Sequence, residues 1–98
     1  MRGETTTPSV VAYKADGRVL VGTDAVQQAP ADAANTVFSA KRFIGRSFRS
    51  VQRFAASAGA EVVESPGGDP AFRCPACADP IAPEEVSAQV LWHRNQEL

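Results

Sequence analysis

Hydrophobic residues occur along the chain in short runs that turn-forming residues interrupt. Residues 9–13 and 18–21 are rich in apolar and β-branched side chains, and Asp16 and Gly17 lie between them. Two such runs around an Asp-Gly pair predict a β-hairpin in which Gly17 adopts a positive φ. The chain is therefore expected to begin with part of a small antiparallel sheet.

The same pattern predicts more short elements further along. Residues 35–38 and 61–64 are expected to be strands. Residues 71–73 are expected to pair with 61–64 across a turn rich in Pro and Gly at 66–70. A short helix is expected over residues 23–29, where a proline follows and ends it.

Serine and glycine mark two helical segments in the middle of the chain. Ser39 is expected to cap a helical turn over residues 40–44, which Gly45 ends. A further helix is expected over residues 48–58, with Gly59 as its C-terminal breaker.

The C-terminal segment shows the clearest helical pattern. Pro83 suits the first position of a helix, and two glutamates follow it where the helix dipole favours acidic groups. Val86, Val90 and Leu91 mark one apolar face. We expect this face to pack on the strands.

These elements predict an α+β fold, in which short antiparallel strands and hairpins pack against a C-terminal helix. The chain has 98 residues, of which 44% are hydrophobic and 21% charged, values close to the average of globular domains. Residues 1–98 are therefore expected to form a single domain or part of one. The net charge of −1 excludes a polybasic nucleic-acid coat. No apolar run approaches the ~18 residues that a membrane-spanning helix needs.

Two features indicate a cytoplasmic protein. Residues 1–8 contain no apolar segment of the kind that secretory signal peptides carry. The chain has two cysteines, too few for the disulfide framework of a small secreted domain.

Those two cysteines, Cys74 and Cys77, form a C-x-x-C pair. This spacing suits two ligands of a tetrahedral zinc ion, but the single histidine, His93, leaves the ligand set one short. The spacing also occurs in redox pairs, which need a helix N-terminus beneath the first cysteine, and the prolines here leave no room for that helix. We favour a plain turn with two free thiols and no metal, and we keep the metal and redox alternatives open.

Half of the ten basic residues fall within positions 41–53, and no acidic residue occurs from 33 to 60. They are Lys41, Arg42, Arg46, Arg49 and Arg53. On a continuous helix the four arginines would form one stripe, suited to phosphates of nucleic acid or of a membrane surface. Gly45 argues against such a helix. The alternatives are a solvated basic face and a phosphate-facing role, in which Lys41 acts as a point charge.

Four stretches of the sequence carry a specific likeness: residues 6–13, 16–22, 35–48 and 82–91. The third contains N-T-V-F-S-A-K-R-F-I-G. In order and spacing they resemble the DnaK-type 70 kDa heat-shock chaperone family, in the outer subdomain of lobe I of its actin-like ATPase domain. The likeness spans about residues 5–91.

The resemblance implies roles for two residues. Lys41 would reach into the ATP cleft, help to place the attacking water and stabilise charge on the γ-phosphate, while Arg42 would line the same cleft. ATP and Mg²⁺ are the implied cofactors, and the family's activity is ATP-driven protein folding. The implied partners are the remainder of the ATPase domain and a co-chaperone or nucleotide-exchange factor, and neither membrane nor nucleic acid is expected.

The chain departs from the family pattern in two places. Only residues 1–4 precede the matching part, where family members carry a phosphate loop, and the matching part ends before the second phosphate loop and the acidic residues that organise magnesium. We therefore expect a truncated or fragmentary member with negligible ATPase activity alone. Between residues 72 and 81, Pro75 and Pro80 cannot donate ladder hydrogen bonds, so the hairpin of the family is expected to be frayed there.

Two other functions stay open. One is a non-catalytic protein-interaction module that uses the surface of the lobe. The other is a small metal- or nucleic-acid-binding protein that uses Cys74 and Cys77 together with the basic segment from Arg42 to Arg53.

Overall fold

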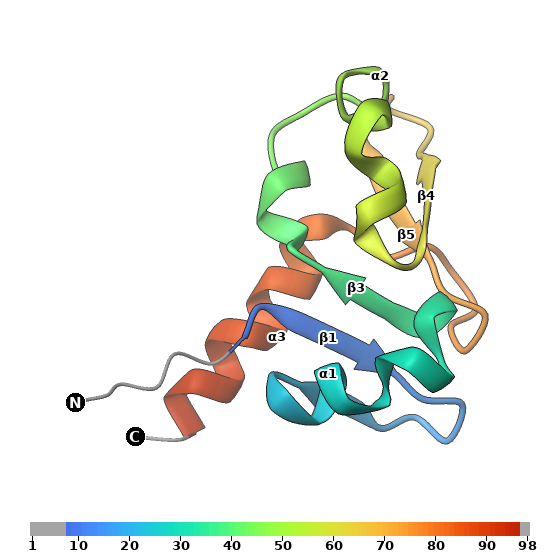
Figure 1. Cartoon of the computed structure of the whole chain (residues 1–98). Helices are drawn as coiled ribbons and strands as arrows, with labels where there is room; N and C mark the ends of the chain where they lie inside the picture. Colours follow the sequence, from blue (N-terminus) through green and yellow to red (C-terminus); the bar gives the residue numbers. More distant parts are fainter. Residues whose placement is uncertain (1–7, 97–98) are drawn as a thin grey trace.

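The structure is a computed structural model and describes residues 8–96. Its N-terminal half is built on a three-stranded antiparallel sheet of β1 (Val10–Tyr13), β2 (Val19–Val21) and β3 (Thr36–Phe38), with β1 in the centre (Figure 1). The predicted hairpin between β1 and β2 is confirmed, and Gly17 in its turn has φ 92°. The predicted extended segment of residues 35–38 is confirmed as β3.

A second, separate sheet consists of the hairpin β4 (Glu61–Glu64) and β5 (Pro70–Arg73), as predicted. The helix α2 (Phe48–Val51) continues as a 3-10 helix over Gln52–Ala58, and the latter packs on β4. The predicted helix over residues 48–58 is thus confirmed in its bounds, but most of it has 3-10 rather than α-helical geometry. The fold is α+β, with its strands divided between two sheets.

The central strand β1 is buried on both faces because successive side chains in a strand point to opposite sides. Val11 and Tyr13 face the main hydrophobic cluster, to which α3 (Pro83–Gln96) contributes. Val10 and Ala12 face a smaller cluster that includes Ala25 of α1 (Thr23–Gln28). The two helices therefore cover opposite faces of the same sheet.

The C-terminal helix begins at Pro83, as predicted, and buries Val86 and Val90. The prediction for Leu91 is wrong, because this side chain is 58% exposed. It follows Val90 by one position, which turns it about 100° around the helix and away from the core. Trp92 is likewise 62% exposed. No helix in the part of the chain that the structure describes is both long and apolar enough to cross a bilayer.

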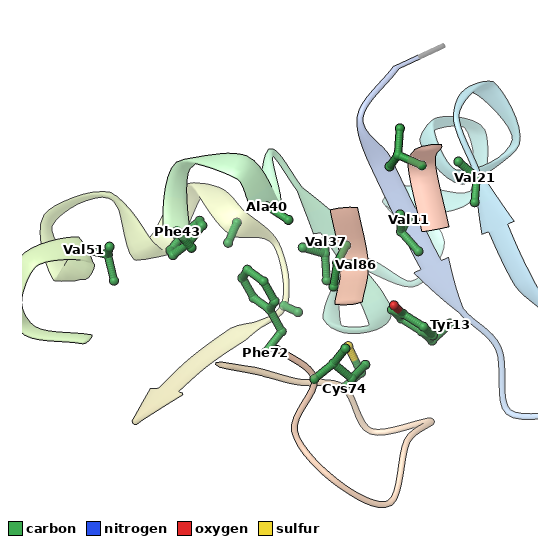
Figure 2. Packing of buried hydrophobic residues seen from close by; sticks show 14 residues of the cluster. Val11, Tyr13, Val21, Val37, Ala40, Phe43, Val51, Phe72, Cys74 and Val86 are labelled. Atoms are coloured by element: carbon green, nitrogen blue, oxygen red, sulfur yellow. The ribbon is translucent and has the colours of Figure 1, made fainter. Parts of the chain in front are cut away.

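The main cluster joins both sheets to α3 (Figure 2). Its largest fully buried side chains are those of Phe43 and Phe72, whose ring centroids lie 5.1 Å apart in an edge-to-face arrangement. Phe43 belongs to the short 3-10 helix over Ala40–Phe43, which follows β3. The core therefore holds the segment that carries the predicted site residues.

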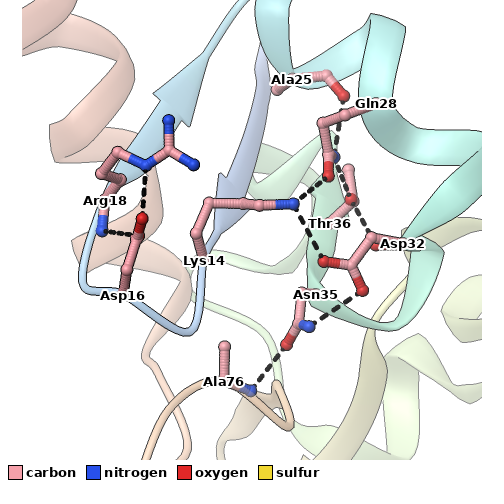
Figure 3. A network of polar contacts seen from close by, with 9 residues as sticks. All are labelled: Lys14, Asp16, Arg18, Ala25, Gln28, Asp32, Asn35, Thr36 and Ala76. Carbon is pink, nitrogen blue, oxygen red and sulfur yellow. Dashed lines mark hydrogen bonds and ion pairs between the residues drawn. The ribbon is translucent and has the colours of Figure 1, made fainter.

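A polar network lies beside this core (Figure 3). The hydroxyl of Thr36, which is fully buried, accepts a hydrogen bond from Gln28 at 2.8 Å and donates one to the carbonyl of Asp32 at 2.9 Å. The ammonium of Lys14 lies 3.3 Å from the Asp32 carboxylate. Gln28 and the Asp32 carbonyl thus satisfy the Thr36 hydroxyl, which would otherwise be costly to bury.

The loop between β5 and α3 passes beside this polar network. Phe72 and Ile81 exchange two backbone hydrogen bonds of 2.8 Å, which form an isolated bridge rather than a ladder. This agrees with the frayed hairpin expected from Pro75 and Pro80. The side chain of Asn35 holds the loop, since its carbonyl oxygen accepts from the Ala76 N–H at 2.8 Å.

Candidate functional site

Lys41 and Arg42 lie on the exposed side of the 3-10 helix Ala40–Phe43, whose first and last residues are buried. Ser39 precedes this helix with φ 58° and ψ 47°, the left-handed conformation that turns the chain sharply out of β3. Its side chain makes no capping hydrogen bond, so the predicted cap is wrong. The backbone closes the turn instead, with the Arg42 N–H donating to the Ser39 carbonyl at 3.1 Å.

Lys41 lines a small hollow on the surface between the start of β1 and α3. Ser9, Ser87 and Leu91 are among the other residues around it. Lys41 is exposed, and within residues 8–96 it forms no ion pair with a carboxylate. Its ammonium group is therefore accessible to an anion from outside the domain.

Arg42 takes a different direction. Its guanidinium carbon lies 4.4 Å from the centroid of the Phe54 ring, within the range of a cation–π contact. Arg42, Arg46, Arg53 and Phe54 line a hollow of about 420 Å³. Lys41 and Arg42, although adjacent in the sequence, thus line different hollows, and nothing in the sequence near Arg42 indicates Phe54 as its partner.

A continuous helix through the basic segment is absent. Ile44 is extended and Gly45 has φ 75°, so the chain leaves the helical path there. The next helix, α2, starts anew after Ser47, whose hydroxyl accepts from the Ser50 N–H at 3.2 Å.

The arginines nevertheless come together, because the break folds the segment back on itself. Arg42, Arg46 and Arg53 share one hollow, and Arg49 lies outside it. Within the described part of the chain, none of the three forms a salt bridge with a carboxylate. The cluster is a site of concentrated positive charge with an aromatic wall.

The two cysteines are free thiols. Cys74 is buried, and this burial raises its pKa to about 11, with the neighbouring Cys77 adding to the shift. Burial and the Glu85 carboxylate raise the pKa of Cys77 as well. In residues 8–96 no group of three or more His, Cys, Asp or Glu side chains is arranged to hold a metal ion. The pair therefore lacks the lowered pKa of a nucleophilic redox cysteine.

Comparison with known proteins places these features in a family. A family model described as Hsp70 protein matches residues 1–97. DnaK of Deinococcus deserti is 49% identical to this chain over 89 residues, which are 91% of the chain and 14% of that protein. DnaK of Cyanidium caldarium is 43% identical over 89 residues, with 91% of the chain and 14% of the relative covered.

A plant protein shows the same likeness. The stromal 70 kDa heat shock-related protein of pea chloroplasts, from Pisum sativum, is 45% identical over 89 residues, which are 91% of this chain and 13% of that protein. The chain thus spans only 13–14% of the length of these three relatives. Since the family model covers nearly all of it, the chain belongs to the Hsp70 family of chaperones, as its motifs predicted.

Proposed function

We propose that this chain forms one wall of the ATP cleft of an Hsp70-type chaperone, with Lys41 placed at the γ-phosphate. The observation that supports this is the position of Lys41, which is exposed on a turn whose flanking Ala40 and Phe43 are buried. Its amine has no carboxylate partner within residues 8–96. A lysine whose backbone is held by buried neighbours, and whose amine has no carboxylate partner among the described residues, can bind an incoming phosphate group.

When bound, ATP would supply the phosphoryl group and Mg²⁺ would neutralise part of its charge. The task of Lys41 is to donate hydrogen bonds to the γ-phosphate oxygens and to orient a water molecule. The left-handed Ser39 and the anchored Phe43 hold the turn, so that the lysine backbone needs no rearrangement. In this proposal Arg42 contributes positive potential from the neighbouring hollow, where its guanidinium lies over Phe54, and does not contact the phosphate itself.

The described residues do not fit a magnesium site. Mg²⁺ prefers carboxylate and water oxygens, and the described part of the chain contains no group of three acidic or other metal-binding side chains. We therefore propose that the chain acts as part of a longer ATPase domain. The remainder of that domain, and a co-chaperone or nucleotide-exchange factor, are the proposed partners, in a cytoplasmic setting.

The first test is a calorimetric titration of the purified chain with Mg-ATP. We expect no stoichiometric binding in the micromolar range and no hydrolysis above the buffer rate. Stoichiometric micromolar binding would show that the chain by itself holds the phosphates, and the one-wall proposal would then be wrong.

The second test places the chain in a working protein. In a full-length DnaK whose matching segment is replaced by this chain, we expect Lys41→Ala to lower single-turnover ATP hydrolysis by about 10²–10³-fold, the usual loss for a group that stabilises transition-state charge. Arg49→Ala removes a nearby exposed cation outside both hollows and is the matched control. Equal losses for the two variants would contradict a specific role for Lys41.

A second candidate function is protein interaction, and the arginine hollow favours it. Three arginines and one aromatic ring line this compact hollow, and guanidinium groups can bind the carboxylates of an acidic loop in bidentate geometry. The test compares an acidic peptide with a short DNA duplex of similar charge. Preferential binding of the peptide, weakened at least tenfold by Arg46→Gln but not by Arg49→Gln, would support an interaction module. Preference for DNA would favour the nucleic-acid alternative.

A further inference from the structure

Cys74 and Cys77 lie in the loop between β5 and α3, where neither proposed function uses them. The backbone N–H of Cys77 donates to the carbonyl of Cys74 at 2.9 Å. This bond between residues i and i+3 closes a β-turn, and the outer Cα atoms of a β-turn lie within about 7 Å of each other. Disulfide bonds span Cα separations of about 4.4–6.8 Å. The backbone therefore brings the two cysteines to a distance at which a disulfide can form.

Both side chains also lie at the main hydrophobic cluster. Cys74 belongs to the main hydrophobic cluster, and Cys77 packs against that cluster from its partly exposed position. The two thiols are close enough for a charge on Cys77 to raise the pKa of Cys74. Cys77, which is partly exposed, is thus the thiol that a small molecule can reach, whereas Cys74 is buried in the core (Figure 2).

The loop around the pair is already held in place. The bridge between Phe72 and Ile81 closes its base with two hydrogen bonds of 2.8 Å. The Asn35 side chain accepts a hydrogen bond from Ala76, which lies between the cysteines (Figure 3). Because the turn is formed and anchored before any reaction, joining the two sulfurs needs little change of the backbone.

We propose that Cys74 and Cys77 form a reversible intramolecular disulfide by exchange with a small-molecule disulfide such as oxidised glutathione. In the first step the Cys77 thiolate attacks one glutathione sulfur, which forms a mixed disulfide and releases one glutathione as its thiol. In the second step the Cys74 sulfur attacks Cys77 of that mixed disulfide and releases the second glutathione. The two protein thiols lose two electrons and two protons in total, and oxidised glutathione gains them.

The environment of the pair makes this a slow, reversible modification rather than a catalytic redox centre. Burial and the Glu85 carboxylate both raise the pKa of Cys77, so its reactive thiolate is scarce and the exchange is slow. It stays reduced while small-molecule thiols are in excess and closes when the glutathione pool becomes oxidised.

The test uses the full chain equilibrated in glutathione buffers of increasing oxidised fraction, quenched with a thiol-alkylating reagent and weighed intact by mass spectrometry. We expect two populations. The reduced chain carries two alkyl groups, and the oxidised chain carries none and is lighter by two hydrogen atoms because its cysteines form a disulfide. Cys74→Ala is expected to stop at a single glutathione adduct on Cys77. Cys77→Ser, which changes the partly exposed member of the pair, is expected to keep an unmodified Cys74, because a buried thiol is shielded from glutathione.

Several results would overturn the proposal. They are a stable single glutathione adduct on the unaltered chain, a disulfide between two chains, or no reaction in a fully oxidised buffer after days at pH 8. A stoichiometric metal ion found in the native mass spectrum, and released by a chelator, would also overturn it and assign the pair to metal binding. Circular dichroism of both variants before oxidation separates loss of folding from loss of reaction. If Cys74→Ala does not fold, the result for Cys77→Ser and the two populations of the unaltered chain still test whether the disulfide forms.

Discussion

The guanidinium carbon of Arg42 lies 4.4 Å from the centroid of the Phe54 ring, which joins the turn after β3 to the 3-10 segment that follows α2. Phe54 in turn lies 5.2 Å from the ring of Phe43. One exposed cation is therefore linked through two aromatic rings to the hydrophobic core. This contact orients Arg42 away from the hollow that Lys41 lines.

A double-mutant cycle measures this contact. Arg42→Gln and Phe54→Leu are each expected to lower the free energy of unfolding. The double variant is expected to lower it by less than the sum of the two single losses. The expected coupling is about 0.5–1 kcal/mol, the usual range for a cation–π pair at a partly exposed site. Urea unfolding at low salt gives the four values. A cycle on Arg49 and Phe54 is the control, and equal coupling in the two cycles would contradict a specific contact.

Gly59 ends the 3-10 segment at φ 85°, and its backbone lies against β3. A Cβ atom added there would lie 2.5 Å from the Thr36 carbonyl oxygen and 2.9 Å from a ring carbon of Phe38. We expect Gly59→Ala to lower the free energy of unfolding by about 2–4 kcal/mol, the sum of backbone strain and overpacking.

Gly17→Ala is the matched control for this prediction. Gly17 also has positive φ, but no atom lies within 4 Å of its added Cβ. Its expected cost is only the backbone strain, about 1–2 kcal/mol. Chemical denaturation of both variants gives the comparison, and equal losses would show that contact with β3 does not matter.

The Thr36 hydroxyl is the central group of the buried polar network. Thr36→Val keeps the shape of the side chain but removes the hydrogen bonds to Gln28 and to the Asp32 carbonyl. We expect a loss of about 1–3 kcal/mol, because the Asp32 carbonyl loses a buried donor. Thr36→Ser keeps the hydroxyl and should cost less. If Ser proved as destabilising as Val, packing of the methyl group, rather than hydrogen bonding, would explain the effect.

Stability is expected to fall at alkaline pH because of Cys74. Its pKa rises from 9.0 to about 11 on folding, so the unfolded chain loses this proton first. The contribution is fully present below pH 9 and is lost as the pH rises through about 11, with a total of roughly 2–3 kcal/mol. Urea midpoints from pH 7 to 11 in a reducing buffer measure this fall. In Cys74→Ala it should be smaller, and an unchanged fall would assign it to other groups.

The hydroxyl of Tyr13 is buried and has no hydrogen-bond partner among the residues that the structure describes. Burial raises its pKa further above the ordinary value, and the Glu85 carboxylate adds to the shift. We expect Tyr13→Phe to leave the free energy of unfolding at pH 7 unchanged or to raise it by up to about 1 kcal/mol, since an unsatisfied polar group is removed. A loss above about 1 kcal/mol in urea unfolding would reveal a partner for the hydroxyl.

Much of the local structure could be predicted from neighbouring residues. The β1–β2 hairpin follows from two apolar runs around Asp16 and Gly17, and α3 begins at Pro83 where its sequence predicts. The errors have local causes too. Leu91 lies one position beyond the buried stripe, and Ser39 adopts a left-handed backbone in which its side chain caps nothing.

The sequence by itself determined the hairpins, the last helix, the break at Gly45 and the family, because these depend on residues close together in the chain and on motifs that can be read in order. Only the tertiary structure decided which distant residues meet. Arg42 with Phe54, Thr36 with Gln28, and Ala76 with Asn35 are such contacts. Their partners are selected by how the two sheets and α3 share one core, and no local pattern encodes that packing.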